Sequence, residues 1–295
     1  VSDMKRRDLL TNLVGVSVGA AGWDPASGEA LRHAVTSGVA ESDGLGLGEW
    51  DRIAWDYGTL MATTAPQDLL DDLAVDLSLA QKSIGAVRRD RDRRVIHRAM
   101  AQLCTFVAQA NSDLGKARTS TRWWRTAKHL ADASDDAPVR MWVRGREAIN
   151  GVYDQRPPEA LLNLVDEATA ITSTPGLGSG SAYAARAQLL ALLGRSREAS
   201  DATAQLRDMF DRLPEAVVRD TASAYGWSQT RLRHTESFVY THLGDVARAD
   251  AAQSAAVAAY RDQRSVGCAQ VRLHQAICLV RQGDVTEGVR HAHRI

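Results

Sequence analysis

The chain has 295 residues, 44% of them hydrophobic, and carries 36 Lys and Arg against 36 Asp and Glu, so its formal net charge is zero. A chain without net charge has no overall field that attracts nucleic acid or an acidic membrane, which argues against a DNA-binding module made by this chain alone. Apolar residues recur at helical spacing and only three Phe and six Tyr are present, so an all-α fold is predicted.

The first 46 residues are predicted to be a leading segment or linker. Arg6 and Arg7 followed by an uncharged stretch over 11–22 resemble the start of a twin-arginine export signal. The stretch is too short to be a stable membrane anchor, and no clear cleavage site precedes Trp23. The alternative interpretation is an interdomain linker or leading helix that lies on the body of the protein.

An atypical capping pair of helices is predicted over residues 47–90. The first helix, over 47–61, carries apolar residues at steps of three and four. Pro66 opens the second, where its missing N–H costs least, and acidic residues follow it near the positive end of the helix.

Five helical hairpins are predicted over residues 91–295, the last one truncated. In each, a small residue is followed twelve positions later by another, and the first members of the pairs are 40, 39, 50 and 39 residues apart. Antiparallel helices joined by a tight turn approach closely only where the facing side chains are small. The pairs are Ala108 and Ser120, Ala148 and Ala160, Ala187 and Ala199, Ser237 and Ala249, and Ala276 and Gly288.

A fixed hairpin period of this size predicts an α-solenoid in which each hairpin packs against its neighbours. The first helices are predicted near 91–112, 138–154, 181–193, 222–243 and 266–281. The second helices are predicted near 116–133, 158–172, 195–210, 245–262 and 285–295. Residues 210–223, interrupted by Pro214, fill the longer step and are expected to bend the array or add a turn on one face.

Several of these motifs resemble a known family. Leu243-Gly244-Asp245-Val246 with the following alanines resembles tetratricopeptide repeats. More narrowly, Asp92-Arg93-Arg94, then Asp113 to Arg118, then Trp124 through Asp132 resemble the repeat region of actinobacterial helix-turn-helix regulators of the Xre type. In that family a stretch like Arg6 to Leu10 often separates the DNA-binding module from the array.

The resemblance implies a right-handed superhelix of tetratricopeptide-like hairpins that serves as the effector or sensor region of a transcriptional regulator. The sequence departs from the family because it holds no helix-turn-helix module, so DNA would be contacted only through a module absent from this chain. The repeat steps also exceed the roughly 34 residues of the simple repeat.

The concave face of such an array, lined by the first helices, is the predicted binding site. Its amides can satisfy backbone groups and its aromatic rings can fill pockets, which suits a peptide, a protein segment or a small-molecule effector. The alternative for the apolar members is ordinary packing between repeats. The candidate residues are Gln102, Gln109, Trp142, Gln188, Arg231, His234, Phe238 and Gln270.

No catalytic residue, cofactor or metal site is predicted. His274 and Cys278 lie one helical turn apart, but two ligands do not close a zinc site. The glycine-rich stretch 176–180 lacks the lysine of a phosphate-binding loop. The three cysteines, an odd number without CxxC spacing, are typical of reduced core residues and favour the cytoplasm.

We therefore expect a cytoplasmic, non-catalytic binding region of a transcriptional regulator, with no membrane partner and with a possible homodimer. Contact with the inner surface is expected to change the superhelical pitch or the dimer arrangement. The alternatives are a stand-alone tetratricopeptide scaffold for protein–protein interaction and a twin-arginine-exported repeat protein. An enzyme is the least supported reading.

Overall fold

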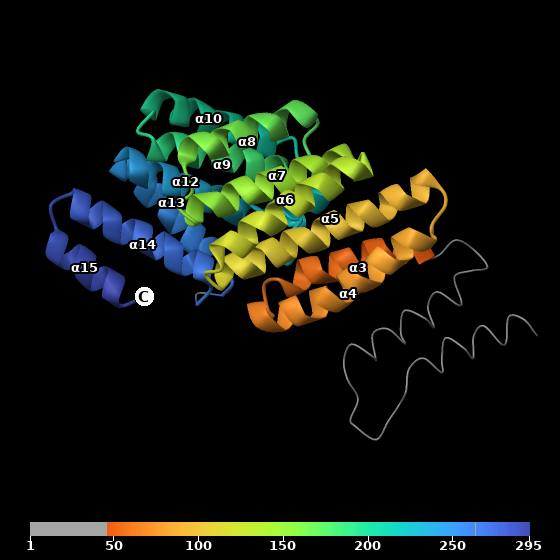
Figure 1. Cartoon of the computed structure of the whole chain (residues 1–295). Helices are drawn as coiled ribbons and strands as arrows, with labels where there is room; N and C mark the ends of the chain where they lie inside the picture. The colour runs from red at the N-terminus through yellow and green to blue at the C-terminus, as the bar shows by residue number, and fades with distance from the viewer. Residues whose placement is uncertain (1–45, 263) are drawn as a thin grey trace, which may run out of the picture.

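The computed structural model describes residues 46–262 and 264–295, and all regular structure in these residues is helical (Figure 1). The all-α prediction is therefore confirmed for the part of the chain that the structure describes. The predicted leading segment and its twin-arginine-like start lie outside the described residues.

The described helices agree with most of the predicted ranges to within a few residues. In chain order they are α3 (Gly46–Leu60), α4 (Pro66–Ala86), α5 (Asp90–Asp113), α6 (Ala117–Ser134), α7 (Ala137–Tyr153), α8 (Pro158–Ile171), α9 (Ser179–Leu192), α10 (Ser196–Phe210), α11 (Glu215–Arg219), α12 (Gln229–Leu243), α13 (Val246–Ala259), α14 (Val266–Arg281) and α15 (Val285–His293).

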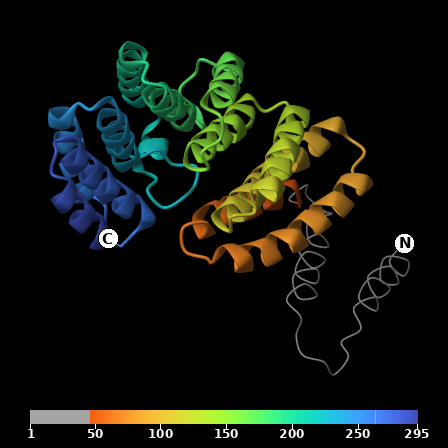
Figure 2. The ribbon, with the colours of Figure 1, turned by 60° about the vertical axis from the view of Figure 1, so that its left-hand side comes forward.

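The helices pack as successive hairpins. Each pair α5–α6, α7–α8, α9–α10, α12–α13 and α14–α15 is joined by a short turn and is in contact. The first helices also contact one another in sequence, α5 with α7, α7 with α9, α9 with α12 and α12 with α14, and α3 and α4 pack on α5. In Figure 2 they follow an arc from α3 to α15, an arrangement consistent with an α-solenoid.

One left-handed residue marks the turn of every hairpin. Gly115, Gln155, Gly194, Gly244 and Gly283 have φ values of 71°, 54°, 68°, 74° and 97° and follow one another at the same steps as the small residues. Glycine reaches this conformation without the steric penalty of a Cβ atom, which explains four of the five positions. Gln155 is the exception.

The second hairpin differs from the prediction in its register. Ala160 is exposed, whereas Leu161 is buried and packs on Gly151, where a methyl group would lie 2.6 Å from the Leu161 Cδ2. The reason is Pro158, which disfavours helical geometry at Pro157, so α8 begins three residues after the left-handed residue instead of two. In the other four pairs both small residues are buried.

The region between the third and fourth hairpins also differs from the prediction. Helix α12 begins at Gln229, not near residue 222, and residues 220–228, here called the crossing segment, are irregular. The Asp220 carboxylate accepts hydrogen bonds from the backbone N–H groups of Ala222 and Ser223 at 3.0 and 2.9 Å. Such local side-chain bonds compete with helix formation.

The short helix α11 is the added turn expected within residues 210–223, and after it the crossing segment runs over the inner side of the arc to α3. The backbone N–H of Ala224 donates to the carbonyl of Gly58 at 2.8 Å, and the Tyr225 hydroxyl donates to the carbonyl of Ala54 at 2.8 Å. In Figure 2 the chain between α10 and α12 lies on the inner side of the arc. Elements far apart in the sequence are thereby joined.

Two glycines inside helices provide the surfaces on which the crossing segment docks. A methyl group on Gly58 of α3 would lie 2.3 Å from a ring carbon of Tyr225. A methyl group on Gly180 of α9 would lie 2.2 Å from the ring of Trp227. Both glycines are needed because an aromatic ring lies where their side chain would be.

Candidate functional site

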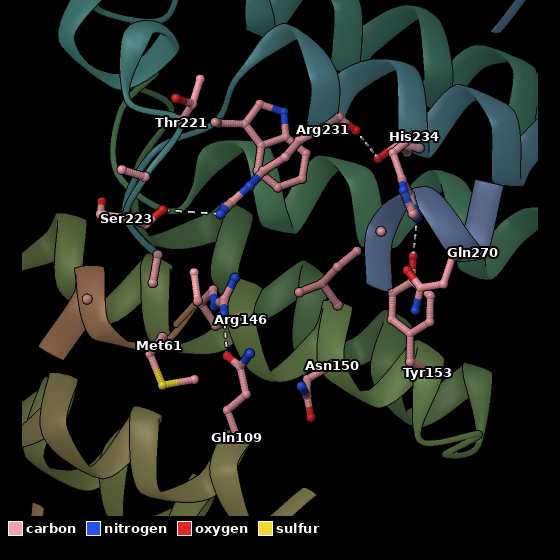
Figure 3. Close-up of a pocket in the computed structure, with 18 of the residues that line it drawn as sticks. Met61, Gln109, Arg146, Asn150, Tyr153, Thr221, Ser223, Arg231, His234 and Gln270 are labelled. Carbon is pink, nitrogen blue, oxygen red and sulfur yellow. Dashed lines mark hydrogen bonds between the residues drawn. The ribbon is translucent and has the colours of Figure 1, made fainter. Parts of the chain in front are cut away.

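A cavity of about 400 Å³ lies between α7, α12 and the crossing segment (Figure 3). Residues 221–224 of the crossing segment and the end of α3 form part of its wall, and α5, α9 and α14 contribute one or two residues each. This volume is within the range of sites for small organic ligands. The crossing segment thus adds a wall to part of the inner face and shapes a partly open site.

Helix α7 lines the cavity along one face. Arg146, Ile149, Asn150 and Tyr153 occupy positions i, i+3, i+4 and i+7, which share a side of a helix and span about 10 Å along its axis. Helix α12 faces them with Arg231 and, one turn further on, with His234 and Thr235. The two arginines therefore lie near one end of the cavity, and Tyr153 and His234 near the other (Figure 3).

The arginine end has donors but no ion pair. Arg231 donates to the backbone carbonyls of Gly226 at 2.7 Å and Ser223 at 3.2 Å, which fixes the crossing segment. Arg146 donates through Nη2 to the Oε1 of Gln109, and its Nε is buried without a partner. Among the described residues, neither guanidinium forms an ion pair with a carboxylate.

Burial lowers the pKa of both arginines at this end of the cavity. Burial, followed by the charge of Arg231, lowers the pKa of Arg146 to about 9, and the charge of Asp113 opposes this shift. Burial lowers the pKa of Arg231 as well, against the opposing charge of Asp220. Arginine side chains remain protonated in proteins at neutral pH, so this end of the cavity carries two positive charges.

The opposite end of the cavity is neutral. The Nε2 of His234 lies 3.0 Å from the Tyr153 hydroxyl, and its Nδ1 lies 2.9 Å from the Tyr260 hydroxyl. Burial, with a further contribution from Arg231, lowers the pKa of His234 to about 4, and burial raises the pKa of Tyr153 to about 12. At pH 7 these rings are therefore uncharged hydrogen-bonding groups.

Two amide side chains at the cavity have an oxygen without a donor. The Oε1 of Gln188 and the Oδ1 of Asn150 are buried, and neither has a partner in the described part of the chain. The Nε2 of Gln188 donates to the Tyr153 hydroxyl at 3.4 Å, a long contact. Buried polar atoms are rarely left unpaired, so these two oxygens indicate that a molecule with donors completes the site.

The structure brings five of the eight sequence-predicted residues to this cavity. Gln102 and Trp142 instead contact the crossing segment: the Tyr225 hydroxyl lies 3.1 Å from the Gln102 Oε1, and its ring centroid lies 5.1 Å from that of Trp142. Phe238 is buried and stacks on His242. The five that line the cavity are Gln109, Gln188, Arg231, His234 and Gln270.

Sequence reasoning missed Arg146, Asn150, Tyr153 and Tyr260 as lining residues, and the wall formed by residues 221–224. The helical spacing of the α7 residues around Ile149 could have identified three of them. The sequence of residues 221–224 shows no comparable periodic pattern, because the position of this segment depends on contacts with α3.

Metal-binding and membrane-spanning features are not found in the described residues. They contain no group of three or more His, Cys, Asp and Glu side chains arranged to hold a metal ion. His274 and Cys278 each contact α12: the His274 Nδ1 lies 2.8 Å from the Ser237 Oγ, and the Cys278 Sγ lies 3.7 Å from the Thr241 Oγ1. Within the same residues, every helix is too short or too polar to cross a membrane.

Comparison of the chain with protein-family models, with curated proteins and with solved structures gives no match. The chemistry of the site is therefore argued from its own residues.

Proposed function

We propose that this chain is the ligand-binding region of a transcriptional regulator, a non-catalytic right-handed superhelix of tetratricopeptide-like hairpins that holds a small organic molecule beneath the crossing segment. The resemblance of its repeats to those of Xre-type regulators supports the regulatory part. In this proposal, DNA is contacted through a separate DNA-binding module. A cytoplasmic location is part of the proposal and is supported by the same resemblance and by the three free, buried cysteines.

One observation supports ligand binding above the others: four polar atoms of residues that line a single cavity are buried without a partner in the described part of the chain. They are the Nε of Arg146, the Oδ1 of Asn150, the Oε1 of Gln188 and the Nε1 of Trp227. A buried polar atom without a partner costs about 1–3 kcal/mol. A ligand that pairs with these atoms would recover this free energy, which makes the ligand-bound chain the more stable state.

A small molecule suits the site better than a long peptide. The crossing segment occupies the part of the inner face where Gln102 and Trp142 lie, and Tyr225 contacts both. An extended peptide along the whole inner face would have to displace Tyr225 from its contacts with α3. A protein tail inserted from one end of the arc remains the alternative occupant.

The position of the cavity supports a sensor role. Its wall includes α3, α5 and α7 from the first half of the arc and α12 and α14 from the second. A ligand that contacts both halves favours one relative arrangement of them, and this preference can be passed to an attached module. A homodimer is part of the proposal, since α14 and α15 leave large apolar side chains exposed: Leu273, Ile277, Val280, Val285 and Val289.

The test is a thermal-unfolding screen of wild type and two tryptophan variants against a panel of small organic acids, phosphates, amines and neutral amides. Ala222 lines the cavity and Ala255 is exposed on α13. We expect at least one compound to raise the melting temperature of wild type and Ala255→Trp, and to have no effect on Ala222→Trp. Equal shifts in all three proteins, or none in wild type, would contradict the proposal.

A further inference from the structure

We propose that the ligand carries an anionic head, a carboxylate or a phosphate, that binds between Arg146 and Arg231, and hydroxyl or N–H donors that reach the amide oxygens of Gln188 and Asn150. This inference rests on the proposed function and specifies the chemical class of the ligand. It concerns the same cavity.

The first argument is uncompensated charge. Arg146 and Arg231 extend toward the same space from α7 and α12 (Figure 3), and both line the cavity. The charge of Asp113 favours the charged form of Arg146 and that of Asp220 favours the charged form of Arg231, but among the described residues neither carboxylate forms an ion pair with its arginine. Two like charges in a largely buried site are unfavourable unless a counter-ion lies between them.

Two buried carboxylates elsewhere in the array are compensated by ion pairs. Glu147 forms ion pairs with Lys128 at 2.8 Å and Arg156 at 3.0 Å. Glu236 forms ion pairs with Arg207 at 2.6 Å and Arg233 at 2.7 Å. Each of these buried carboxylates thus has two cations in ion-pair contact, whereas neither cavity arginine forms an ion pair among the described residues.

The second argument is unused donor capacity. A guanidinium has five N–H donors in a plane, and such a fork matches two oxygens of a carboxylate or phosphate. Arg146 uses Nη2 for Gln109 and leaves Nε buried without a partner. Arg231 donates to two carbonyls of the crossing segment through Nη1 and Nη2. An oxyanion between them would accept from the remaining N–H groups.

The third argument concerns the rest of the ligand. The far end of the cavity is uncharged, and the unpaired atoms there, the Gln188 Oε1 and Asn150 Oδ1, are acceptors. Arg146 and Tyr153 are seven residues apart on α7, which corresponds to about 10 Å. The ligand class is therefore a hydroxylated or amino-bearing organic acid or phosphate ester of about this length.

The experiment uses probes that separate charge from shape. 4-Hydroxyphenylacetate and its neutral amide, 4-hydroxyphenylacetamide, share a ring and a hydroxyl group and differ in the anionic head. Inorganic phosphate tests the head alone. Binding is measured by calorimetry and thermal unfolding, with ionic strength held constant by sodium chloride. We expect the acid to bind wild type at least about tenfold more tightly than the amide.

The variants identify the site of binding. Arg146→Gln removes a positive charge, and Gln109→Glu places a carboxylate beside Arg146 as an internal counter-ion. Both are expected to raise the melting temperature of the unliganded chain and to lower the affinity for the acid at least tenfold. Arg197→Gln, on the exposed side of α10, should bind the acid as wild type does.

Each outcome decides a question. Binding of phosphate without the acid assigns a phosphate ester, and binding of the acid assigns a carboxylate. Equal binding of acid and amide, or no loss in Arg146→Gln and Gln109→Glu, overturns the anionic head. If the acid, the amide and phosphate all fail to bind, the anionic head is wrong. The proposed function is then decided separately by the compound panel: a neutral compound that stabilises wild type but not Ala222→Trp would support ligand binding in this cavity.

Discussion

Gln188 shows at the scale of one residue how stability and binding oppose each other. Its side chain is buried, its Oε1 lacks a donor, and its Nε2 makes only a long contact with Tyr153. Gln102 is a useful contrast, because its Oε1 is a partner of the Tyr225 hydroxyl at 3.1 Å. The amide oxygen of Gln102 thus has a protein partner, whereas that of Gln188, by the proposal, is paired only when a ligand is bound.

We expect Gln188→Met to raise the free energy of unfolding of the unliganded chain by about 1 kcal/mol, since it removes an unpaired buried oxygen at similar volume. The same variant should weaken ligand binding. Gln102→Met should instead lower the free energy of unfolding by about 1 kcal/mol, because it breaks a hydrogen bond. Urea unfolding measures both. A loss of stability in Gln188→Met similar to that in Gln102→Met would contradict the role given to Gln188.

The direction of single side chains was only partly predictable from the sequence. Arg231, Gln188 and His234 were found because a helical face repeats every three to four residues. Arg146 was missed although it lies one turn after Trp142. Residues one turn apart share a helix face only approximately. The crossing segment covers Trp142, whereas Arg146 lines the cavity.

At the scale of elements, the hairpins were predictable because their signals are local. A glycine in the turn, small residues on the facing sides and apolar spacing lie within one hairpin, as in the third with Gly194. The register of α8 was not predictable from the alanine spacing alone, because Pro158 delays the start of that helix. Here a local backbone effect outweighed the repeat pattern.

The crossing segment was not predictable because its contacts are far apart in the sequence. Tyr225 docks on Gly58 and bonds to Ala54 at a separation of 171 residues. No periodicity links these positions. The helix expected from residue 222 gives way to the turn that Asp220 forms with its own following residues.

Because the crossing segment docks on a helical glycine, replacement of that glycine by alanine is expected to change stability in the direction opposite to the usual one. Replacing a helical glycine by alanine normally stabilises a helix by up to about 1 kcal/mol, and Gly85, with open space around it, should follow this rule. Gly58→Ala should do the opposite and lower the free energy of unfolding by about 1–3 kcal/mol, because it displaces the Tyr225 ring. Stabilisation by both variants in thermal unfolding would show that Tyr225 does not pack on α3.

At the scale of the whole molecule, the crossing segment adds a contact that a simple repeat array lacks. In such an array each hairpin touches only its neighbours. Here the chain before α12 is bonded to α3 through Ala224 and Tyr225, across the inner side of the arc. This contact holds one wall of the cavity in place against α3, so a ligand beneath the segment is positioned to bias the shape of the array.

The most direct test of a ligand site beneath the crossing segment is amide hydrogen exchange at Ala224, measured by NMR with and without 4-hydroxyphenylacetate. Its N–H donates to the Gly58 carbonyl at 2.8 Å across the inner face, whereas Thr221 is exposed at the start of the segment. We expect the Ala224 amide to exchange orders of magnitude more slowly than that of Thr221, and more slowly still with the acid bound. Exchange of Ala224 as fast as Thr221, unchanged by the acid, would contradict the account.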